Sequence, residues 1–257
     1  MELFQAYQLM KPLTCLLAAL CGIAACATAL ATEPNTLSEP EQTAGWRLLW
    51  DGKTDTGWRS ARSEAFPKTG WTLKDGELTV AAAGGAEAAA GGDIVTREKF
   101  SDFELLVEFK ISPGANSGIK IFVDTELNQG AGSSIGPEFQ ILDDAKHPDA
   151  KLGRDGNRTL GSLYDLIPAP ADKTVKPIGE WNQARILAQG KHVEFWLNGH
   201  KTVEFERGSP AWLKTVADSK FKTWPAFGQL DEGHILLQDH GNQVSFRNLK
   251  IRTPGAI

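Results

Sequence analysis

Residues 136–144 read Gly-Pro-Glu-Phe-Gln-Ile-Leu-Asp-Asp, a pattern that predicts a β-strand with two unlike faces. Side chains alternate between the faces of a strand, so Phe139 and Ile141 point one way and Glu138 and Gln140 point the other. One face is therefore apolar enough to join a hydrophobic core. The other face presents a carboxylate and an amide.

A second strand near the C-terminus, residues 235–240, repeats this arrangement and places Gln238 and His240 on one face. Two strands with apolar flanks and a polar face have two interpretations. The polar face is either the floor of a ligand-binding sheet, or it is polar because it faces water. The sequence alone leaves both open, although the recurrence on two strands favours the binding floor.

Length and composition predict one large all-β domain. The chain has 257 residues, of which 41% are hydrophobic, and its formal net charge is -5, so no nucleic acid partner is expected. All three cysteines, Cys15, Cys21 and Cys26, fall in the first 31 residues. The remaining domain therefore has neither a disulfide nor a thiolate metal site, and packing alone must stabilise it.

The N-terminal segment has the pattern of an export signal. Residues 1–31 contain Lys11 followed by an apolar stretch, and residues 32–44 form a polar linker before a domain spanning 45–257. Residues 23–26, Ile-Ala-Ala-Cys, resemble a bacterial lipobox, which we favour over simple cleavage after Ala31. We expect an exported protein in the periplasm or cell envelope, attached to a membrane only through a lipid on Cys26. The oligomeric state stays open.

Strand and turn signals dominate the rest of the chain. Residues 103–111 alternate apolar and polar side chains, and Asp75-Gly76 and Asn198-Gly199 are typical of tight hairpin turns. A phase slip in the last strand predicts a bulge near Asn248. One short helix is expected over 210–220. These elements predict a β-sandwich of two sheets, whereas the Ala/Gly-rich residues 81–92 are expected to form a loop without chemistry.

Three further groups are candidates for function. Asn116 and Lys120 flank Gly118, where a ligand can approach the backbone; a solvated Lys120 is the simpler alternative. The polar loop 143–158 offers Asp143 and His147 as ligand or metal contacts, or is only a solvated rim. Tyr164 is a hydroxyl donor or an ordinary aromatic side chain. Four tryptophans are candidates for stacking on a sugar: Trp58, Trp181, Trp196 and Trp224.

Taken together, blocks across the whole domain resemble the 3-keto-disaccharide hydrolase domains of bacterial surface and periplasmic proteins. The blocks lie at residues 49–58, 116–118, 138–144, 161–164, 179–182, 196–199, 237–240 and 246–251. The resemblance implies a concanavalin A-like jelly-roll sandwich with its cleft on the concave sheet. Many members carry an arginine where this chain has Phe122, so the nearby cation here is Lys120.

The resemblance also implies cleavage of a glycoside that has been oxidised to a ketone at C3. An oxidised di- or oligosaccharide or glucoside is the implied partner, and a divalent metal stays open as a cofactor. Expected catalytic residues are Glu138, His240, Lys120 and Tyr164; expected substrate-binding residues are Asn116, Gln140, Gln238, His147 and Asp143. Two alternatives remain: a non-catalytic glycan-binding module, and a conventional glycoside hydrolase with Asp143 or Asp239 as its second carboxylate.

Overall fold

The computed structural model describes residues 33–127, 133–224 and 226–253. The expected signal peptide and its Cys26 lie outside these residues. Within the described ranges, no helix combines the length and the apolar character needed to cross a membrane.

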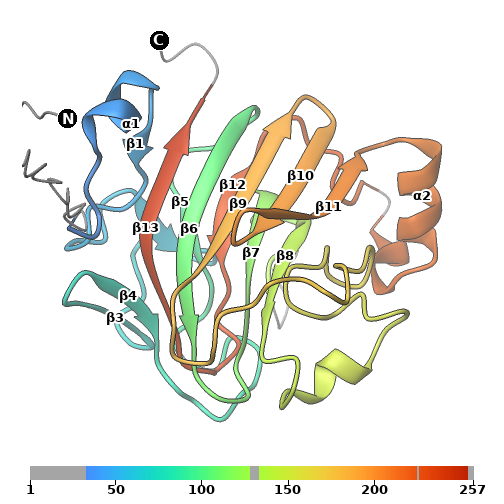
Figure 1. Ribbon diagram of the computed structural model, residues 1–257, viewed down its shortest axis with the longest axis horizontal. Coiled ribbons are helices and arrows are strands. Elements are labelled where there is room, and N and C mark those ends of the chain that lie inside the picture. Colours follow the sequence, from blue (N-terminus) through green and yellow to red (C-terminus); the bar gives the residue numbers. More distant parts are fainter. Residues whose placement is uncertain (1–32, 128–132, 225, 254–257) are drawn as a thin grey trace, which may run out of the picture. The chain divides into compact units, whose positions relative to one another are not determined.

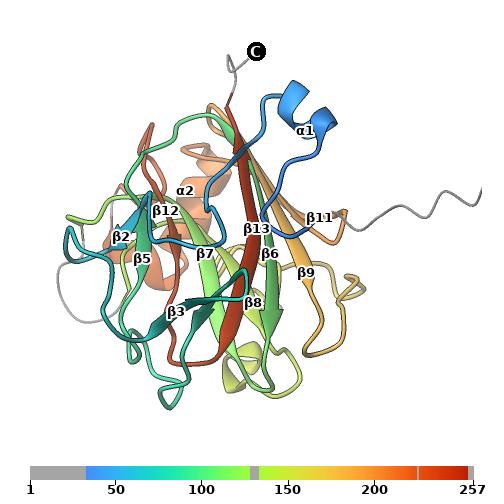
Figure 2. The ribbon, with the colours of Figure 1, turned by 90° about the vertical axis from the view of Figure 1, so that its left-hand side faces the viewer.

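Two antiparallel sheets pack as layers, one on each side of a shared core, and Figure 2 shows them side by side. The larger sheet contains, in spatial order, β11 (His200–Glu206), β10 (His192–Leu197), β9 (Asn182–Gln189), β6 (Phe103–Ile111), β13 (Val244–Arg252), β4 (Glu77–Val80) and β3 (Trp71–Lys74), with β1 (Arg47–Leu48) paired to β13. The smaller sheet contains β2 (Trp58–Ser60), β5 (Ile94–Thr96), β12 (His234–Leu237), β7 (Asn116–Val123) and β8 (Glu138–Leu142). The predicted all-β jelly-roll sandwich is confirmed.

Aromatic side chains connect the two sheets through the core. The ring of Phe139 on β8 lies 6.3 Å from that of Phe109 on β6 and 5.5 Å from that of Phe195 on β10. All three are fully buried. Burying a phenylalanine stabilises a fold by roughly 1.5–3 kcal/mol, and edge-to-face contacts add to this. The apolar face of β8 is thereby fixed in the core, which directs Glu138 and Gln140 to the opposite face.

The predicted turns and bulge are present. Asp75 and Gly76 both have positive φ, as do Asn198 and Gly199, which is the backbone that a two-residue hairpin turn requires. The pairing of β13 with β6 shifts register between Arg247 and Lys250, at the expected bulge. This shift returns Leu249 and Ile251 to the core after Val244 and Phe246.

Helices are few and short. In α2 (Pro210–Ala217), Ser209 caps the N-terminus and Trp212 and Val216 are buried, as predicted, but the helix ends three residues before the expected end at Lys220. The described residues also contain two 3-10 helices, η1 (Pro148–Lys151) and η2 (Lys220–Thr223). Figure 1 shows α2 beyond the β11 edge of the sandwich.

The predicted polar linker is wrong for residues 33–44, which are part of the fold. They contain α1 (Glu39–Thr43), whose capping box pairs Ser38 with Glu41. Asn35 is buried, and its backbone N–H and side-chain oxygen bond reciprocally with Asn248 at 2.6 and 2.8 Å. The side-chain amide of Asn35 also donates to the carbonyl oxygen of Gly76. Sequence reasoning saw only polar composition, whereas these polar groups satisfy the backbone of the β13 bulge.

We expect Asn35→Ala to destabilise the domain by about 2 kcal/mol, because it leaves the backbone N–H of Asn248 and the carbonyl of Gly76 without partners. Alanine also tolerates the positive φ at this position poorly. Urea unfolding of the protein measures the change. Thr36→Ala, at the exposed neighbouring position, is the control. Equal stability of the two variants would mean that this segment is only a tether.

Candidate active site

A cavity of about 200 Å³ lies over the five-stranded sheet and collects most of the predicted polar residues. Its polar floor comes from three neighbouring strands: Asn116 and Lys120 on β7, Glu138 and Gln140 on β8, and Gln238 and His240 just after β12. Loops and η2 complete the walls with Glu87, Ser133, Ser134, Ile135, Gly136, Tyr164, Lys220, Phe221 and Trp224. The strand-parity argument therefore placed these floor residues together correctly.

Strand pairing explains the position of Glu138. Lys120 on β7 lies opposite Glu138 on β8, and Gly118 lies opposite Gln140. A Cβ atom at Gly118 would lie 2.1 Å from Oε1 of Glu138. The group that approaches the backbone at Gly118 is thus the Glu138 side chain, because only glycine leaves room for this carboxylate on the floor.

Lys120 is buried and its ammonium group has partners within the protein, which excludes the solvated-lysine alternative. Its Nζ donates to the carbonyl oxygen of Ser134 at 3.1 Å and to Oγ of Ser133, and it lies 3.7 Å from Oε2 of Glu138. The hydroxyl of Ser133 in turn donates to the buried Asp93. One ammonium group thus interacts with two buried carboxylates, directly with Glu138 and through the hydroxyl of Ser133 with Asp93.

Burial raises the pKa of Glu138 to about 7. Lys120 and Lys220 lower it, whereas the carboxylates of Glu87 and Asp93 raise it. Desolvation exceeds the attraction of the two cations because a buried carboxylate loses most of its hydration. A carboxyl group with this pKa exists in both protonation states at neutral pH, which suits a general acid–base group.

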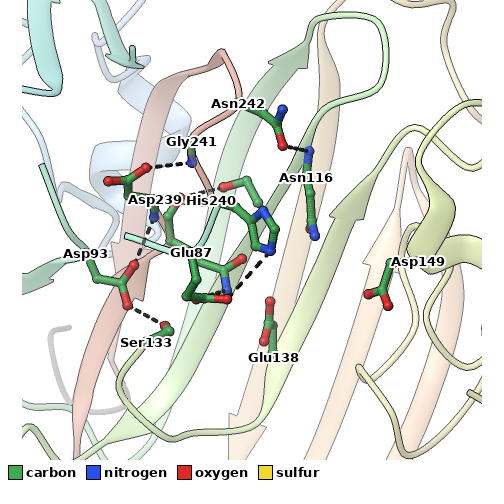
Figure 3. A network of polar contacts seen from close by, with 12 residues as sticks. Glu87, Asp93, Asn116, Ser133, Glu138, Asp149, Asp239, His240, Gly241 and Asn242 are labelled. Atoms are coloured by element: carbon green, nitrogen blue, oxygen red, sulfur yellow. Dashed lines mark hydrogen bonds and ion pairs between the residues drawn. The ribbon is translucent and has the colours of Figure 1, made fainter. Parts of the chain in front are cut away.

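Glu87 was missed by sequence reasoning, which assigned no chemistry to residues 81–92. Its Oε2 lies 3.6 Å from Nε2 of His240, and its Oε1 accepts a hydrogen bond from the side-chain amide of Gln238 at 2.8 Å. Figure 3 shows Glu87, His240 and Glu138 directed toward one another. An acidic residue in an Ala/Gly-rich loop has no periodic signal, so only the tertiary structure reveals it.

Asp239 explains why this loop is held in place. Its Oδ2 accepts hydrogen bonds from the backbone N–H groups of Ala90, Gly91 and Gly92, at 2.8–2.9 Å. Its other oxygen accepts from the N–H of Gly241 (Figure 3). Asp239 therefore points away from the cavity, as strand parity predicts, and positions the loop that carries Glu87.

Four buried atoms on the floor have no hydrogen-bonding partner among the described residues: Oδ1 of Asn116, Oε1 of Gln140, Oε1 of Gln238 and Nδ1 of His240. Buried polar atoms are normally paired, because an unpaired one costs about 1–3 kcal/mol. Their gathering around one cavity favours a binding floor over a merely wet sheet face. A polyhydroxylated ligand offers the donors and acceptors that these atoms lack.

Tyr164 lines the cavity as predicted. Burial and the nearby Glu138 raise the pKa of its hydroxyl, so the group stays protonated at neutral pH. Its ring lies beside two cations, Arg158 at 5.3 Å and Lys220 at 4.2 Å from the centroid. Tyr164 is thus a neutral hydrogen-bond donor at the wall.

Two predicted substrate contacts lie outside the cavity lining. His147 caps the N-terminus of η1, where its Nδ1 accepts from the N–H of Asp149, and its ring packs edge-on against His240 at 5.9 Å. Asp143 instead accepts hydrogen bonds from the backbone of Gly114, Ala145 and Lys146. The predicted contact role of Asp143 is therefore corrected to a turn-stabilising one, because backbone donors occupy its carboxylate.

Of the four candidate tryptophans, only Trp224 lines the cavity. Trp58 is buried in the core. Trp181 packs against Lys110 and Arg247, and Trp196 against Arg185 and Lys201, on the larger sheet. Lys220 and Phe221 join Trp224 on the same wall and were not predicted, since nothing in the sequence indicates that η2 folds over the floor.

The described residues of the cavity do not include a group of three side chains placed to hold a metal ion. Among the described residues, the one group of three His, Asp or Glu side chains with ligand atoms within 4.8 Å of one another is His192, Glu194 and Glu204. These residues lie on β10 and β11 of the other sheet, and Lys201 already pairs with both glutamates. The floor instead presents amides, one histidine and glutamates occupied by other partners.

Residues 45–252 match the family described as the 3-keto-alpha-glucoside-1,2-lyase-like domain. The chain belongs to this family. It is also 38% identical, over 86% of its length and 83% of the relative's, to a 3-keto-disaccharide hydrolase of Bacteroides thetaiotaomicron.

Solved structures agree with this membership. A putative glycosyl hydrolase from Parabacteroides distasonis has a TM-score of 0.74 at 30% identity, covering 86% of this chain and 99% of that one. A second putative glycosyl hydrolase from the same organism has a TM-score of 0.53 at 29% identity, covering 76% and 98%. The 3-keto-alpha-glucoside-1,2-lyase-like fold therefore extends over nearly all of the described residues.

The raised pKa of Glu138 predicts a pH-dependent stability in this lyase-like domain. The folded state holds the proton up to about pH 7, whereas the unfolded chain releases it near its ordinary value of 4.5. The folded state therefore binds more protons in this window, and the free energy of unfolding falls as pH rises through it. Glu138→Gln removes this dependence, so its stability relative to the wild type should increase by up to about 3 kcal/mol between pH 4 and 9.

Urea unfolding at both pH values measures this difference. Glu204→Gln removes one exposed negative charge from the other sheet and serves as the control. A stability difference between Glu138→Gln and wild type that is the same at both pH values would contradict the raised pKa.

Proposed function

We propose that this protein is a carbohydrate hydrolase that cleaves the glycosidic bond of sugars oxidised to a ketone at C3. One observation carries the proposal. The four floor atoms without a partner among the described residues line the same cavity as a buried glutamate, Glu138, whose pKa is about 7. The family and the name of the Bacteroides relative support the substrate class.

The chemistry follows from the ketone. A carbonyl at C3 acidifies the hydrogen on C2, and the leaving group at C1 lies beta to the enolate that forms when this hydrogen is removed. Expulsion of the leaving group gives an enone, and addition of water to the enone completes a net hydrolysis. The reaction requires a base at C2, an acid for the leaving oxygen and a stabilising group at the C3 oxygen.

Glu138 is the base in this proposal. Its carboxylate is partly deprotonated at neutral pH, yet basic enough to accept a carbon-bound proton into the water-poor floor. Lys120 acts on Glu138 itself: its positive charge lowers the pKa of a carboxyl group that burial raises. Without Lys120, we expect Glu138 to stay protonated to higher pH and to lose activity as a base.

His240 is the acid for the leaving oxygen in this proposal, and its Nε2 lies 3.6 Å from the carboxylate of Glu87. After elimination, neutral His240 takes a proton from the water that attacks C1. Protonated Glu138 then returns its proton to C2. Both groups regain their starting states, and the sum is one glycosidic bond broken and one water consumed.

The remaining floor and wall groups orient the sugar. Oε1 of Gln140 and of Gln238 and Oδ1 of Asn116 are acceptors for sugar hydroxyls. Tyr164 donates a hydrogen bond from its neutral hydroxyl, and Trp224 offers an apolar face to a sugar ring. His147 holds the ring of His240 in position through an edge-on ring contact.

The experiment compares turnover of 3-keto-trehalose and a 3-keto-β-glucoside with that of their unoxidised parents, with and without EDTA. We expect cleavage of the keto sugars alone. Loss of activity with EDTA would establish that a divalent metal takes part. Sugar binding without any product would overturn the proposal and identify a glycan-binding module instead.

Variants test the assigned roles. Glu138→Gln should lower kcat/KM for the keto sugar by about 10²–10⁴-fold, because the amide cannot accept the C2 proton. His240→Ala should lower it by a similar factor for poor leaving groups and much less for an activated aryl leaving group, which needs no acid. Glu204→Gln is the matched control and should retain wild-type turnover. Full activity of Glu138→Gln would refute its assignment as base.

Glu87 favours one competing function. The conventional glycoside hydrolase lacked a second carboxylate, since Asp143 and Asp239 both bond to backbone groups. Glu87 supplies such a carboxylate in the same cavity as Glu138. Cleavage of the unoxidised parents at rates comparable with the keto sugars would establish this second function.

A further inference from the structure

Lys220 on η2 lines the same cavity as Lys120 on β7. It is the first residue of η2, where Ser219 caps the helix by accepting from the N–H of Phe221. The backbone N–H of Lys220 donates to Oδ2 of Asp165 at 2.8 Å, and the other carboxylate oxygen of Asp165 accepts from Arg158. The main chain at Lys220 is therefore fixed relative to the loop that carries Tyr164.

The ammonium group of Lys220 has aromatic neighbours only. Its Nζ lies 4.2 Å from the ring centroid of Tyr164 and 5.1 Å from that of Phe221. Within the described part of the chain, no hydrogen bond or ion pair at this Nζ is found. Lys120 differs in this respect, because Ser133, Ser134 and Glu138 already occupy its ammonium group.

The electrostatic surroundings of Lys220 make an added acceptor favourable. Desolvation lowers the pKa of Lys220 although the residue as a whole is exposed, and Lys120 and Arg158 lower it further. Glu138 and Asp165 act in the opposite direction. A negative charge developing in the cavity would offset the desolvation of this ammonium group, so Lys220 interacts more strongly with an anion than with a neutral ligand.

The proposed elimination creates such a charge at one atom. Removing the C2 proton moves an electron pair into the C2–C3 bond and places negative charge on the C3 oxygen. An unoxidised sugar has an alcohol at C3 and develops no charge there. A cation that lines the same cavity as the base therefore discriminates between the two substrates in the transition state and not in binding.

We propose that Lys220 donates a hydrogen bond to the C3 oxygen of the oxidised sugar and stabilises the enolate, while Lys120 only sets the charge state of Glu138. This inference rests on the proposed function and adds the residue that makes the reaction specific for a ketone. It assigns this role to Lys220 and not to Lys120, the lysine that the sequence predicts as catalytic, because the ammonium of Lys120 already contacts Ser133, Ser134 and Glu138.

The test measures turnover and enolate formation separately. Lys220→Met keeps the length and apolar contacts of the side chain but removes its charge, and should lower kcat for the keto sugar by about 10²–10³-fold with little change in KM. Exchange of the C2 hydrogen for deuterium in D2O, followed by NMR, should fall by the same factor. Lys220→Arg should recover at least tenfold over Lys220→Met, because the positive charge is restored.

Lys222→Met is the matched control, since Lys222 lies on the same 3-10 helix, is exposed and does not line the cavity. It should retain wild-type kcat and exchange. Thermal unfolding and binding of the unoxidised parent check that Lys220→Met is folded with an intact floor.

The outcomes separate this inference from the proposed function. If the wild type neither cleaves the keto sugar nor exchanges its C2 hydrogen, the proposed function fails and Lys220 has no enolate to stabilise. If the wild type is active and folded Lys220→Met retains kcat and exchange within threefold, the assignment of Lys220 is overturned while the function stands.

Discussion

The site depends on one ammonium group placed between two buried carboxylates. Lys120 pairs with Glu138 across two strands and reaches Asp93 through the hydroxyl of Ser133. Burial raises the pKa of Glu138 to about 7 against the attraction of Lys120 and Lys220, and the carboxylates of Glu87 and Asp93 raise it further. Burial also raises the pKa of Asp93. Desolvation of these carboxyl groups is therefore the source of the acid–base chemistry of the floor.

The packing of the sandwich offsets the free-energy cost of this desolvated floor. The opposite face of β8 carries Phe139 and Ile141 into a continuous core, and this burial offsets the free-energy cost of keeping unpaired polar atoms on the floor. Gly118 leaves the space that the carboxylate occupies. Function and stability thus use the two faces of the same strand.

The walls are positioned by aspartates that never enter the cavity. Asp239 gathers three backbone N–H groups and so fixes the loop of Glu87, while Asp165 fixes the start of η2 and with it Lys220. Both carboxylates are buried and accept only from donors within the chain. Such side-chain-to-backbone bonds give loops the rigidity that a catalytic site requires without adding secondary structure.

Local sequence patterns predict the two-sheet sandwich and the residues of the polar floor. Period-two alternation over β6 and β8, turn residues at Asp75-Gly76 and Asn198-Gly199, and the phase slip at Asn248 are local signals, because each depends on neighbouring residues only. The same parity placed Glu138 with Gln140, and Gln238 with His240, and turned Asp239 away. The motif blocks that pointed to the family are equally local.

Only long-range contacts show which charged side chains line the cavity and which are already paired within the chain. Glu87, Lys220 and the fold-bound segment 33–44 lie in short or irregular stretches whose partners are distant along the chain, as Asn35 and Asn248 illustrate. From composition alone, these stretches are expected to be a loop without chemistry or a polar linker. Likewise, Asp143 and Lys120 looked available for a ligand until their donors and acceptors were found within the protein. Residue type and spacing give the chemistry that a side chain can perform, but whether its charge is already satisfied depends on long-range contacts that no local pattern records.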